Sequence, residues 1–385
     1  MMKGLVPSSR QRYSCLNHKR RRYERRRRPA MKHIAIDLGS RESQICIRDS
    51  SGTILVEEKR ATCSLGKYLA GVEKSRVLLE SCAEAFVVAD AARAAGHEVV
   101  VVPAKLVRQL GVGDRGIKND VRDAQQLSNV SCRLADLPSV HIPSTLSRER
   151  KAMCNMREAQ IEARTKLVNT ARSWLRTQGI GVLRGGGQET FPGRFRRHVA
   201  SRGRTVPEEV NRVLQALEAL NLGILEADKQ LAKAAESDPI CKLLMTAPGI
   251  GPVSSLRYAA ALDDISRFHS AHGVEAYLGV VPGENSTGES RKRRMTGITK
   301  AGPPRVRWAL TQAAWAVLRC KKRDPMAQWA WEVAKRRGKK CAAVALVRKL
   351  SGVLYAMWRD GKPYDPHHAG KATRMAGLVA NPIVP

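Results

Sequence analysis

The sequence predicts an α/β domain followed by a mostly helical chain, and three observations lead to this fold class. Short β-rich runs begin near Lys32. Strand-like and helix-like stretches then alternate as far as about Leu137. From Leu146 to about Trp358, apolar residues recur mainly at helical spacing. We therefore expect a mixed-sheet domain, a helical linker and a mostly helical C-terminal domain.

The first three strands are expected in the runs KHIAIDLGS, SQICIRD and TILVEEKR, which follow one another closely after Met31. Each run is rich in β-branched and apolar residues, and the segment from Asp49 to Gly52 supplies a turn before the third run. Short connections of this kind join antiparallel strands. We therefore expect the domain to start with three antiparallel strands.

Helices and strands alternate after this start. A helical stretch around Leu65 to Val72 leads to the strand RVLLES, and an alanine-rich helix from about Glu84 to Ala95 leads to the apolar run EVVVVP. Strands that alternate with helices are added in parallel to the same sheet. The resulting order, β-β-β-α-β-α-β-α, is that of ribonuclease H-like folds, and we expect it over residues 31–140.

Two long amphipathic stretches predict a helical hairpin or coiled coil over residues 141–237. Thr205 and Glu208 have capping-box spacing before the second helix. Between the helices, GGGQETFPGRFRR is expected to form a loop with arginines available for phosphates. The apolar stripes expected to be buried are, in the first helix, Met153, Met156, Leu167, Ala171, Trp174 and Leu175, and in the second, Val210, Val213, Leu217, Leu220, Ile224 and Leu231.

Residues 238–358 are expected to form a compact, mostly helical domain. Near its start, LLMTAPGIGPVSSLRYAAAL indicates helix, turn and helix, and so is similar to a helix-hairpin-helix that presents backbone N–H groups near Gly249 and Gly251 to a DNA phosphate. The same glycines would equally serve a plain helix connection with a glycine C-cap, so both interpretations stay open. Helical spacing predicts core positions for Trp308, Trp315, Trp329 and Trp331.

The net charge of +33 exceeds what solubility requires, and nucleic acid is the first candidate for a polyanionic partner. The basic residues occur throughout the chain, in segments such as 25–28, 291–294 and 335–340. Residues 1–30 are expected to be a disordered basic extension, and residues 359–385 a flexible tail. Charge of this kind predicts binding and does not by itself predict catalysis.

Cysteine usage and hydropathy predict the compartment. The nine cysteines include no CxxC pair, a pattern that favours reduced thiols in a cytoplasm. No uninterrupted apolar stretch reaches the roughly 18 residues needed to span a bilayer. We therefore expect a soluble cytoplasmic protein, associated with the nucleoid and without a membrane partner.

Four carboxylates are candidates for one metal site. Asp37 ends the first predicted strand and Glu80 the fourth, so the expected sheet brings both to neighbouring strand ends. Asp120 and Asp123 follow on one face of a helix. Divalent cations remove the mutual repulsion of such acids, and Mg²⁺ is the expected ion. The alternative for each acid is a solvated carboxylate or an ion pair. This alternative suits Asp37 and Glu80 least, because both end apolar strands.

A polar segment near the C-terminus, VVPGENSTGESRKRRMTGITKAG, contains the candidate nucleophile Ser286. A serine hydroxyl needs a base or a metal to take its proton, and cations to hold the phosphate that it attacks. An ordinary Ser-Thr-Gly turn beside a solvated basic run is the alternative. The candidate nucleic-acid contacts nearby are Arg291, Lys292, Arg293, Arg294 and Lys300.

With these motifs in place, the chain resembles the DEDD transposases of insertion sequences, the IS110 and IS1111 family. The shared landmarks run from His33 to about Leu318, in the order AIDLGS, LLES, KNDVRDAQQL, TAPGIGP, DISRF, AYLGVVP, NSTG and GITKAG. The chain departs from the family at Pro303 and Pro304, where the family usually continues with a small polar residue into a helix. Residues 1–30 have no counterpart in the family.

The resemblance implies a RuvC-like nuclease domain, a coiled-coil linker and a C-terminal transposase domain. It implies that Asp37, Glu80, Asp120 and Asp123 bind Mg²⁺, and that Ser286 attacks DNA and forms a transient phosphoserine link. It also implies a homo-oligomer, a dimer or a tetramer, in which the serine and the acids meet from different subunits. A non-coding bridge RNA would pair with double-stranded donor and target DNA, and the expected function is strand exchange between them.

Two other classes of function remain open from the residues alone. In a Holliday-junction or other structure-specific endonuclease, the acids would activate water and Ser286 would be structural, so no covalent protein–DNA adduct would form. In a non-catalytic, basic nucleic-acid-binding protein, salt-dependent binding would survive the loss of any carboxylate.

Overall fold

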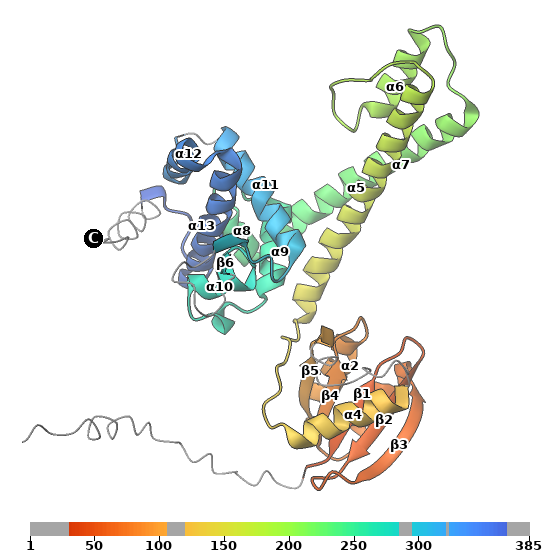
Figure 1. Ribbon diagram of the computed structural model, residues 1–385, viewed down its shortest axis with the longest axis vertical. Helices are drawn as coiled ribbons and strands as arrows, with labels where there is room; N and C mark the ends of the chain where they lie inside the picture. Colours follow the sequence, from red (N-terminus) through yellow and green to blue (C-terminus); the bar gives the residue numbers. More distant parts are fainter. Residues whose placement is uncertain (1–30, 106–119, 285–294, 321–322, 368–385) are drawn as a thin grey trace, which may run out of the picture. The chain divides into compact units, whose positions relative to one another are not determined.

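The computed structural model describes residues 31–105, 120–284, 295–320 and 323–367 of the 385-residue chain (Figure 1). The chain divides into two compact units, one up to Ile142 and one from Pro143 onward. Several predicted features lie outside the described residues. These are the basic extension 1–30, Ser286, the basic run 291–294 and the end of the predicted tail, residues 368–385.

A five-stranded mixed sheet forms the first unit, with its strands in the order β3-β2-β1-β4-β5. The first three strands are antiparallel, and β4 and β5 are added in parallel to β1. This matches the predicted pairing and is compatible with a ribonuclease H-like domain. The strands are β1 (His33–Asp37), β2 (Glu42–Arg48), β3 (Ile54–Ala61), β4 (Arg76–Glu80) and β5 (Glu98–Val102).

Successive side chains of each strand point to opposite faces of the sheet, and both faces are buried. The described helical elements of this unit are η2 (Thr62–Ser64), α1 (Leu65–Ala70), α2 (Ala85–Ala94) and α4 (Asp120–Arg133). Ile34 and Leu79 belong to the face that packs against α1 and α2. Ala35 and Leu78 belong to the other face, where Leu127 of α4 packs on them and α4 crosses the sheet (Figure 1).

In the second unit, α5 (Thr145–Thr177) and α7 (Glu208–Ser237) pack against each other as a hairpin with α6 (Phe191–Ala200) at its tip (Figure 1). A loop was predicted between the long helices. This prediction is wrong for FPGRFRR, because these residues form the start of α6. Phe191, Phe195 and Val199 recur every four residues and bury one face of α6 against the hairpin. Pro192 lies in the first turn, where the missing N–H has no intrahelical partner to lose.

The predicted stripes of α5 and α7 are largely buried. Met156 is an exception: its side chain is 65% exposed, and its predicted burial is wrong. The predicted capping box is also wrong, because α7 begins at Glu208 and its N-cap is Pro207 rather than Thr205. The predicted stripe residues that are buried are Ala171, Leu175, Val210, Leu217, Ile224 and Leu231.

The C-terminal helices form one core with α13 among them. Leu346, Leu350 and Leu354 of α13 are buried in that core. By length and composition, α13 is the one helix in the described part of the chain that is apolar enough to cross a membrane; a core helix passes the same test. The elements are α8 (Pro239–Leu244), α9 (Pro252–Leu262), η3 (Ile265–Arg267), α10 (Ala271–Tyr277), α11 (Pro304–Cys320), α12 (Pro325–Arg337) and α13 (Lys339–Asp360).

A small antiparallel sheet interrupts these helices. Its strands are β6 (Pro282–Glu284) and β7 (Met295–Ile298), with Pro282 paired to Ile298 and Glu284 to Met295. The domain was predicted to be mostly helical, and this pair of strands was not part of that prediction. The segment 285–294, which contains Ser286, joins the two strands in sequence.

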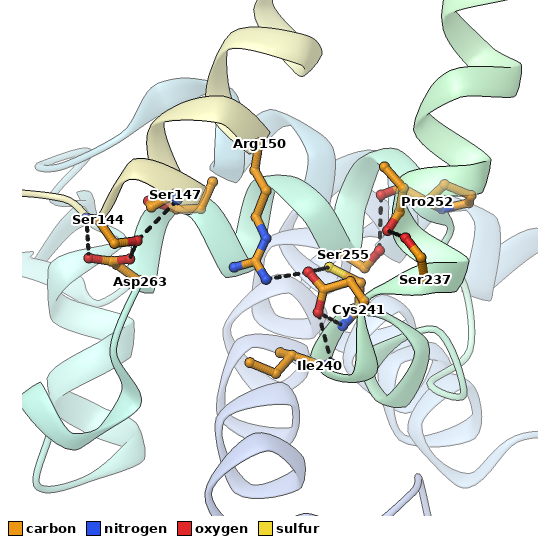
Figure 2. A network of polar contacts seen from close by, with 12 residues as sticks. Ser144, Ser147, Arg150, Ser237, Ile240, Cys241, Pro252, Ser255 and Asp263 are labelled. Carbon is orange, nitrogen blue, oxygen red and sulfur yellow. Dashed lines mark hydrogen bonds and ion pairs between the residues drawn. The ribbon is translucent and has the colours of Figure 1, made fainter.

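Polar contacts join the base of the hairpin to the C-terminal core (Figure 2). Arg150 of α5 forms an ion pair with Asp238, the N-cap of α8. The backbone N–H of Ser144 donates to Oδ2 of Asp263 at 2.9 Å, and the Ser147 hydroxyl donates to the Ala260 carbonyl at 2.6 Å. The start of α5 is therefore fixed to the helices α8 and α9.

Tyr364 fixes the described start of the predicted tail to the core. Its backbone N–H donates to Oγ1 of Thr246 at 2.9 Å, and its hydroxyl lies 3.1 Å from both carboxylate oxygens of Asp324. Burial, followed by the nearby Asp324 charge, raises the pKa of this hydroxyl. The flexible tail was therefore predicted to start too early.

Candidate active site

Asp37 and Glu80 end neighbouring parallel strands. Ile36 pairs with Leu79 in the register between β1 and β4, so the two acids that follow these residues lie side by side at the carboxyl ends. Both acids continue the alternation of the face that α4 covers, and both side chains are partly exposed. The sheet therefore brings these two predicted site residues together.

Helix α4 crosses this face obliquely, and toward its N-terminal end the Gln125 side chain donates to Oε1 of Glu57 on β3 at 2.5 Å. Near its C-terminal end, Oγ of Ser131 is hydrogen-bonded to Nδ1 of His33, at the start of β1, at 2.9 Å. From Ser131 back to Asp120 the helix rises about 16 Å, while the five residues of β1 advance about 13 Å. The first turn of α4 therefore lies toward the end of the sheet where β1 and β4 end, on the side of β3.

Asp120 and Asp123 lie on the stripe of α4 that faces the sheet. They precede the buried residues Ala124 and Leu127 by four positions each, which is one helical turn. Asp120 itself is exposed and Asp123 is partly buried. The helix thus carries both predicted acids on its sheet side, in its first turn.

The charge of Asp120 also reaches the sheet. The pKa of Lys59 is raised, first by its contact with Glu42 and to a smaller extent by the negative charge of Asp120. Lys59 pairs across the sheet with Gln44, and Gln44 pairs with Asp37. Asp120 is therefore near the row of the sheet that contains Asp37.

The four acids lie at one end of one interface without forming a closed set of ligands. Among residues 31–105, 120–284, 295–320 and 323–367, no three His, Cys, Asp or Glu side chains approach closely enough to hold a metal ion. The donor chemistry fits a hard divalent cation, because such ions prefer carboxylate oxygens. Asp37 and Glu80, which are already neighbours, are the pair best arranged to hold one.

The predicted phosphate-binding turn lies between α8 and α9, with helices on both sides as expected. Gly249 has φ +78°, and a Cβ there would lie 2.6 Å from the carbonyl oxygen of Ala313 and 2.8 Å from Cγ2 of Val317. Packing against α11 therefore explains Gly249. Gly251 is the N-cap of α9, and a Cβ there would meet no atom within 4 Å. Gly251 is thus open to approach by a ligand.

Of the predicted basic contacts, Lys300 is the one that the structure describes. It follows β7, is exposed and has φ +56°, and its N–H donates to the Gly279 carbonyl at 3.0 Å. The basic run 291–294 and Ser286 lie outside the described residues.

A basic surface that the sequence analysis did not single out as a site lies where α12 meets α13. Its five cations, which we call the basic junction, are exposed. Lys335 pairs with Glu332, whereas the described residues provide no carboxylate partner for Arg337 or Lys340. The members of the basic junction are Lys335, Arg336, Arg337, Lys339 and Lys340. The run is visible in the sequence, but its exposure is not, nor is it visible there that the described residues provide no carboxylate partner for Arg337 or Lys340.

The start of α13 makes the basic junction electrostatically unfavourable. Lys339 and Lys340 occupy the first turn, which contains no acid, and Gly338 at the N-cap offers no side-chain acceptor. The positive end of the helix dipole lies at the N-terminus and repels cations placed there. A bound anion such as a phosphate would relieve this repulsion.

A cavity of about 760 Å³ lies along α5, where α9 and α11 contribute to its wall. Trp308 lines it and is 50% exposed, so its predicted core position is wrong; Trp315, Trp329 and Trp331 pack against the core as expected. The wall carries charges of both signs, which gives the cavity no preference for a polyanion. The charged residues are Arg157, Glu158, Glu162, Lys166 and Arg257.

Comparison with known proteins shows which class of protein the chain belongs to. Residues 34–179 match a model of transposases of the DEDD, IS110 type. Residues 241–330 match a model described as the transposase IS116/IS110/IS902 family. The two matches cover the sheet with its acids, the start of the hairpin and much of the C-terminal core. They define the class of the protein as DNA transposases.

Individual relatives agree with the models. The chain is 27% identical over 345 residues to a probable family 20 transposase of Pseudomonas aeruginosa, covering 87% of this chain and 99% of the relative. It is 26% identical over 356 residues to the transposase for insertion sequence element IS1111A of Coxiella burnetii, covering 88% and 94%. It is 30% identical over 298 residues to a putative transposase of Sinorhizobium fredii, covering 70% and 72%. The chain belongs to the IS116/IS110/IS902 family of insertion-sequence transposases.

Proposed function

We propose that this transposase joins donor to target DNA through a magnesium-binding acidic site and a serine nucleophile. Asp37, Glu80, Asp120 and Asp123 would hold Mg²⁺, and Ser286 would attack the DNA. The observation that carries the proposal is the common location of the acids. Two end adjacent strands on the face that α4 covers, and two lie in the first turn of that helix, at the same end of the sheet.

The chemistry proceeds in two exchanges of one phosphodiester. Oγ of Ser286 attacks the phosphorus and gives its proton to a base or to water, while the bond from phosphorus to one DNA oxygen breaks and that oxygen takes up a proton and leaves as a DNA hydroxyl. A hydroxyl of the second DNA end then displaces Oγ, which regains a proton, so the number of phosphate ester bonds is unchanged. Mg²⁺ bound by the acids would stabilise the negative charge that develops on the phosphate oxygens.

The nucleic-acid contacts complete the proposal. Membership of the family supports DNA as the substrate. We assign phosphate contacts to Lys300, to the turn at Gly251, to the basic junction and to the predicted run of Arg291, Lys292, Arg293 and Arg294. A bridge RNA that pairs with donor and target, and a homo-oligomer that unites the serine of one subunit with the acids of another, rest on the family resemblance alone.

The test combines strand joining with trapping of the covalent intermediate. Purified protein is mixed with element DNA, its RNA and Mg²⁺, and the Ser286→Ala variant should lose both joining and the protein–DNA adduct. Thr287→Ala, which removes the adjacent hydroxyl, is the matched control and should keep both. Asp37→Asn should lose joining while DNA binding is retained.

The outcomes separate the candidate mechanisms. Unchanged joining by Ser286→Ala would remove the serine from the mechanism. Cleavage that depends on Asp37 but never yields an adduct would instead indicate an endonuclease that activates water.

A further inference from the structure

Arg76 is a buried, charged side chain that none of the proposed chemical steps uses. It lies at the start of β4, on the face that α4 covers, and is 3% exposed. Its Nη1 donates to the carbonyl oxygens of Ser131 at 3.2 Å and Leu134 at 3.0 Å, and its Nη2 to that of Ala135 at 2.8 Å. Its Nε lies 3.2 Å from Oε1 of Glu98. One guanidinium thus bonds one carbonyl in the last turn of α4 and two carbonyls directly after its end.

These carbonyls are suited to a cation. The last carbonyls of a helix have no intrahelical donor and carry the negative end of the helix dipole. Hydrogen bonds from a charged donor are stronger than neutral ones, and the planar fork of arginine meets several acceptors that a lysine ammonium cannot reach together. Arg76 therefore fixes the C-terminal end of α4 to the start of β4.

Two further side chains hold the same half of the helix. Nδ1 of His33 is hydrogen-bonded to Oγ of Ser131 at 2.9 Å. Nε of Arg48, at the end of β2, donates to Oγ of Ser128 at 2.8 Å. A slip of α4 by one residue would shift its first turn by about 1.5 Å and rotate it by about 100°. Contacts at the C-terminal half therefore control where the N-terminal acids lie.

We propose that Arg76 is a positioning residue for the acidic site, which sets the register of α4 so that Asp120 and Asp123 face Asp37 and Glu80. The inference rests on the proposed metal site. Glu80 follows Arg76 by four residues on the same face, about 13 Å along the strand. One strand thus carries both the anchor of α4 and one acid of the site, and so fixes the helix acids relative to the sheet acids.

The test measures metal binding apart from catalysis. Binding of Mn²⁺ to the purified full chain, without DNA, is followed by electron paramagnetic resonance, with thermal unfolding measured in parallel. Arg76→Gln should bind Mn²⁺ about 10- to 100-fold more weakly, as expected when a group that orients metal ligands is lost. Arg76→Lys, which keeps the charge and fewer hydrogen bonds, should lose less. Raised Mn²⁺ should restore strand joining by Arg76→Gln, but not by Asp37→Asn.

His97→Gln is the matched control for stability. His97 is 6% exposed in the same unit; its Nδ1 accepts from the Ser75 N–H at 3.1 Å and its Nε2 donates to the Leu69 carbonyl at 2.8 Å, away from α4. This variant should unfold at a lower temperature and yet bind Mn²⁺ as the unmodified protein does.

Three results would overturn the proposal. The first is wild-type Mn²⁺ affinity in Arg76→Gln. The second is an equal loss of affinity in His97→Gln at equal loss of stability, which would mean that general loosening is the cause. The third is an Asp37→Asn variant that binds Mn²⁺ as tightly as the unmodified protein. This result would reject the proposed metal site itself, and with it the role of Arg76.

Discussion

Arg150 and Asp238 form an ion pair whose side chains are 7% and 11% exposed, and the same aspartate caps α8. Oδ1 of Asp238 accepts the backbone N–H groups of Ile240 at 3.0 Å and Cys241 at 3.2 Å, while Oδ2 contacts Arg150. Removing one partner of a buried pair leaves the other charge without compensation. One carboxylate therefore serves both the hairpin and the C-terminal core.

Replacing Arg150 by methionine should destabilise the protein strongly. We expect a loss of about 3–5 kcal/mol in the free energy of unfolding, because the Asp238 carboxylate would stay buried without its partner. Asp238→Asn, which keeps an acceptor for the cap, should lose less than Asp238→Ala. Arg212→Met is the control, since its pair with Glu208 is well exposed and is worth less than about 1 kcal/mol. Urea unfolding measures all four variants, and equal effects at Arg150 and Arg212 would contradict the prediction.

The Cys241 thiol lies beside the ion pair of Arg150 and Asp238 and shows whether that contact stays closed. Burial, followed by the nearby Asp238 charge, raises the pKa of this thiol to about 12 from its ordinary value of 9.0. The unfolded chain therefore releases this proton first as the pH rises, so the contribution to stability decreases between pH 9.0 and about 12. At pH 8, iodoacetamide should modify the exposed Cys63 and Cys341 well before Cys241. Mass spectrometry of the native protein checks this order. Early labelling of Cys241 would show that the contact between the hairpin and the C-terminal core opens.

Gly249 and Gly251 should respond differently to alanine. Gly249→Ala should destabilise the protein by about 1–3 kcal/mol through its left-handed backbone alone, with the contact to Ala313 adding to the loss. Gly251→Ala should be nearly neutral for stability, because its φ of −111° suits alanine and no atom lies within 4 Å of the new Cβ.

DNA affinity then decides what the turn does. If the turn presents its N–H groups to a phosphate, the Cβ of Gly251→Ala weakens DNA binding at unchanged stability. Equal affinities of Gly251→Ala and the unmodified protein would leave a plain helix connection as the role of the turn. Filter binding beside thermal unfolding separates the two interpretations.

Local patterns explain which parts of the fold could be predicted. The strands around Asp37 and Glu80 are short apolar runs with turns between them, and parallel register follows from their connections. Helix α6 was missed because its apolar face depends on few residues, chiefly Phe191, Phe195 and Val199, in a segment rich in glycine and proline. Met156 was misassigned because periodicity defines a stripe but not how much of it a partner covers.

The site shows the same limit. Adjacency of Asp37 and Glu80 could be predicted from strand order, since parallel strands end at one edge. Which face of the sheet α4 covers could not, because it depends on packing between distant segments. Arg76 had no local signal at all, since its acceptors are backbone carbonyls more than 50 residues away.

The basic junction should control the salt dependence of DNA binding. Each phosphate contact that is lost should reduce the slope of log affinity against log salt by about 0.9, so Arg337→Gln with Lys340→Gln should reduce it by about 1.8. Arg212→Gln with Lys229→Gln is the control; it removes the same charge from α7, where both cations pair with glutamates. An equal slope in the two double variants would mean that net charge alone acts.

Lys340→Gln should also change stability in the direction opposite to affinity. Removing a cation from the first turn of α13 relieves its repulsion by the helix dipole, so the free energy of unfolding should rise by about 0.3–1 kcal/mol at low salt. A residue kept for packing would lower both stability and binding when replaced. Weaker DNA binding by a more stable protein is therefore the signature of a surface shaped for phosphate, and a fall in both quantities would assign Lys340 to the fold instead.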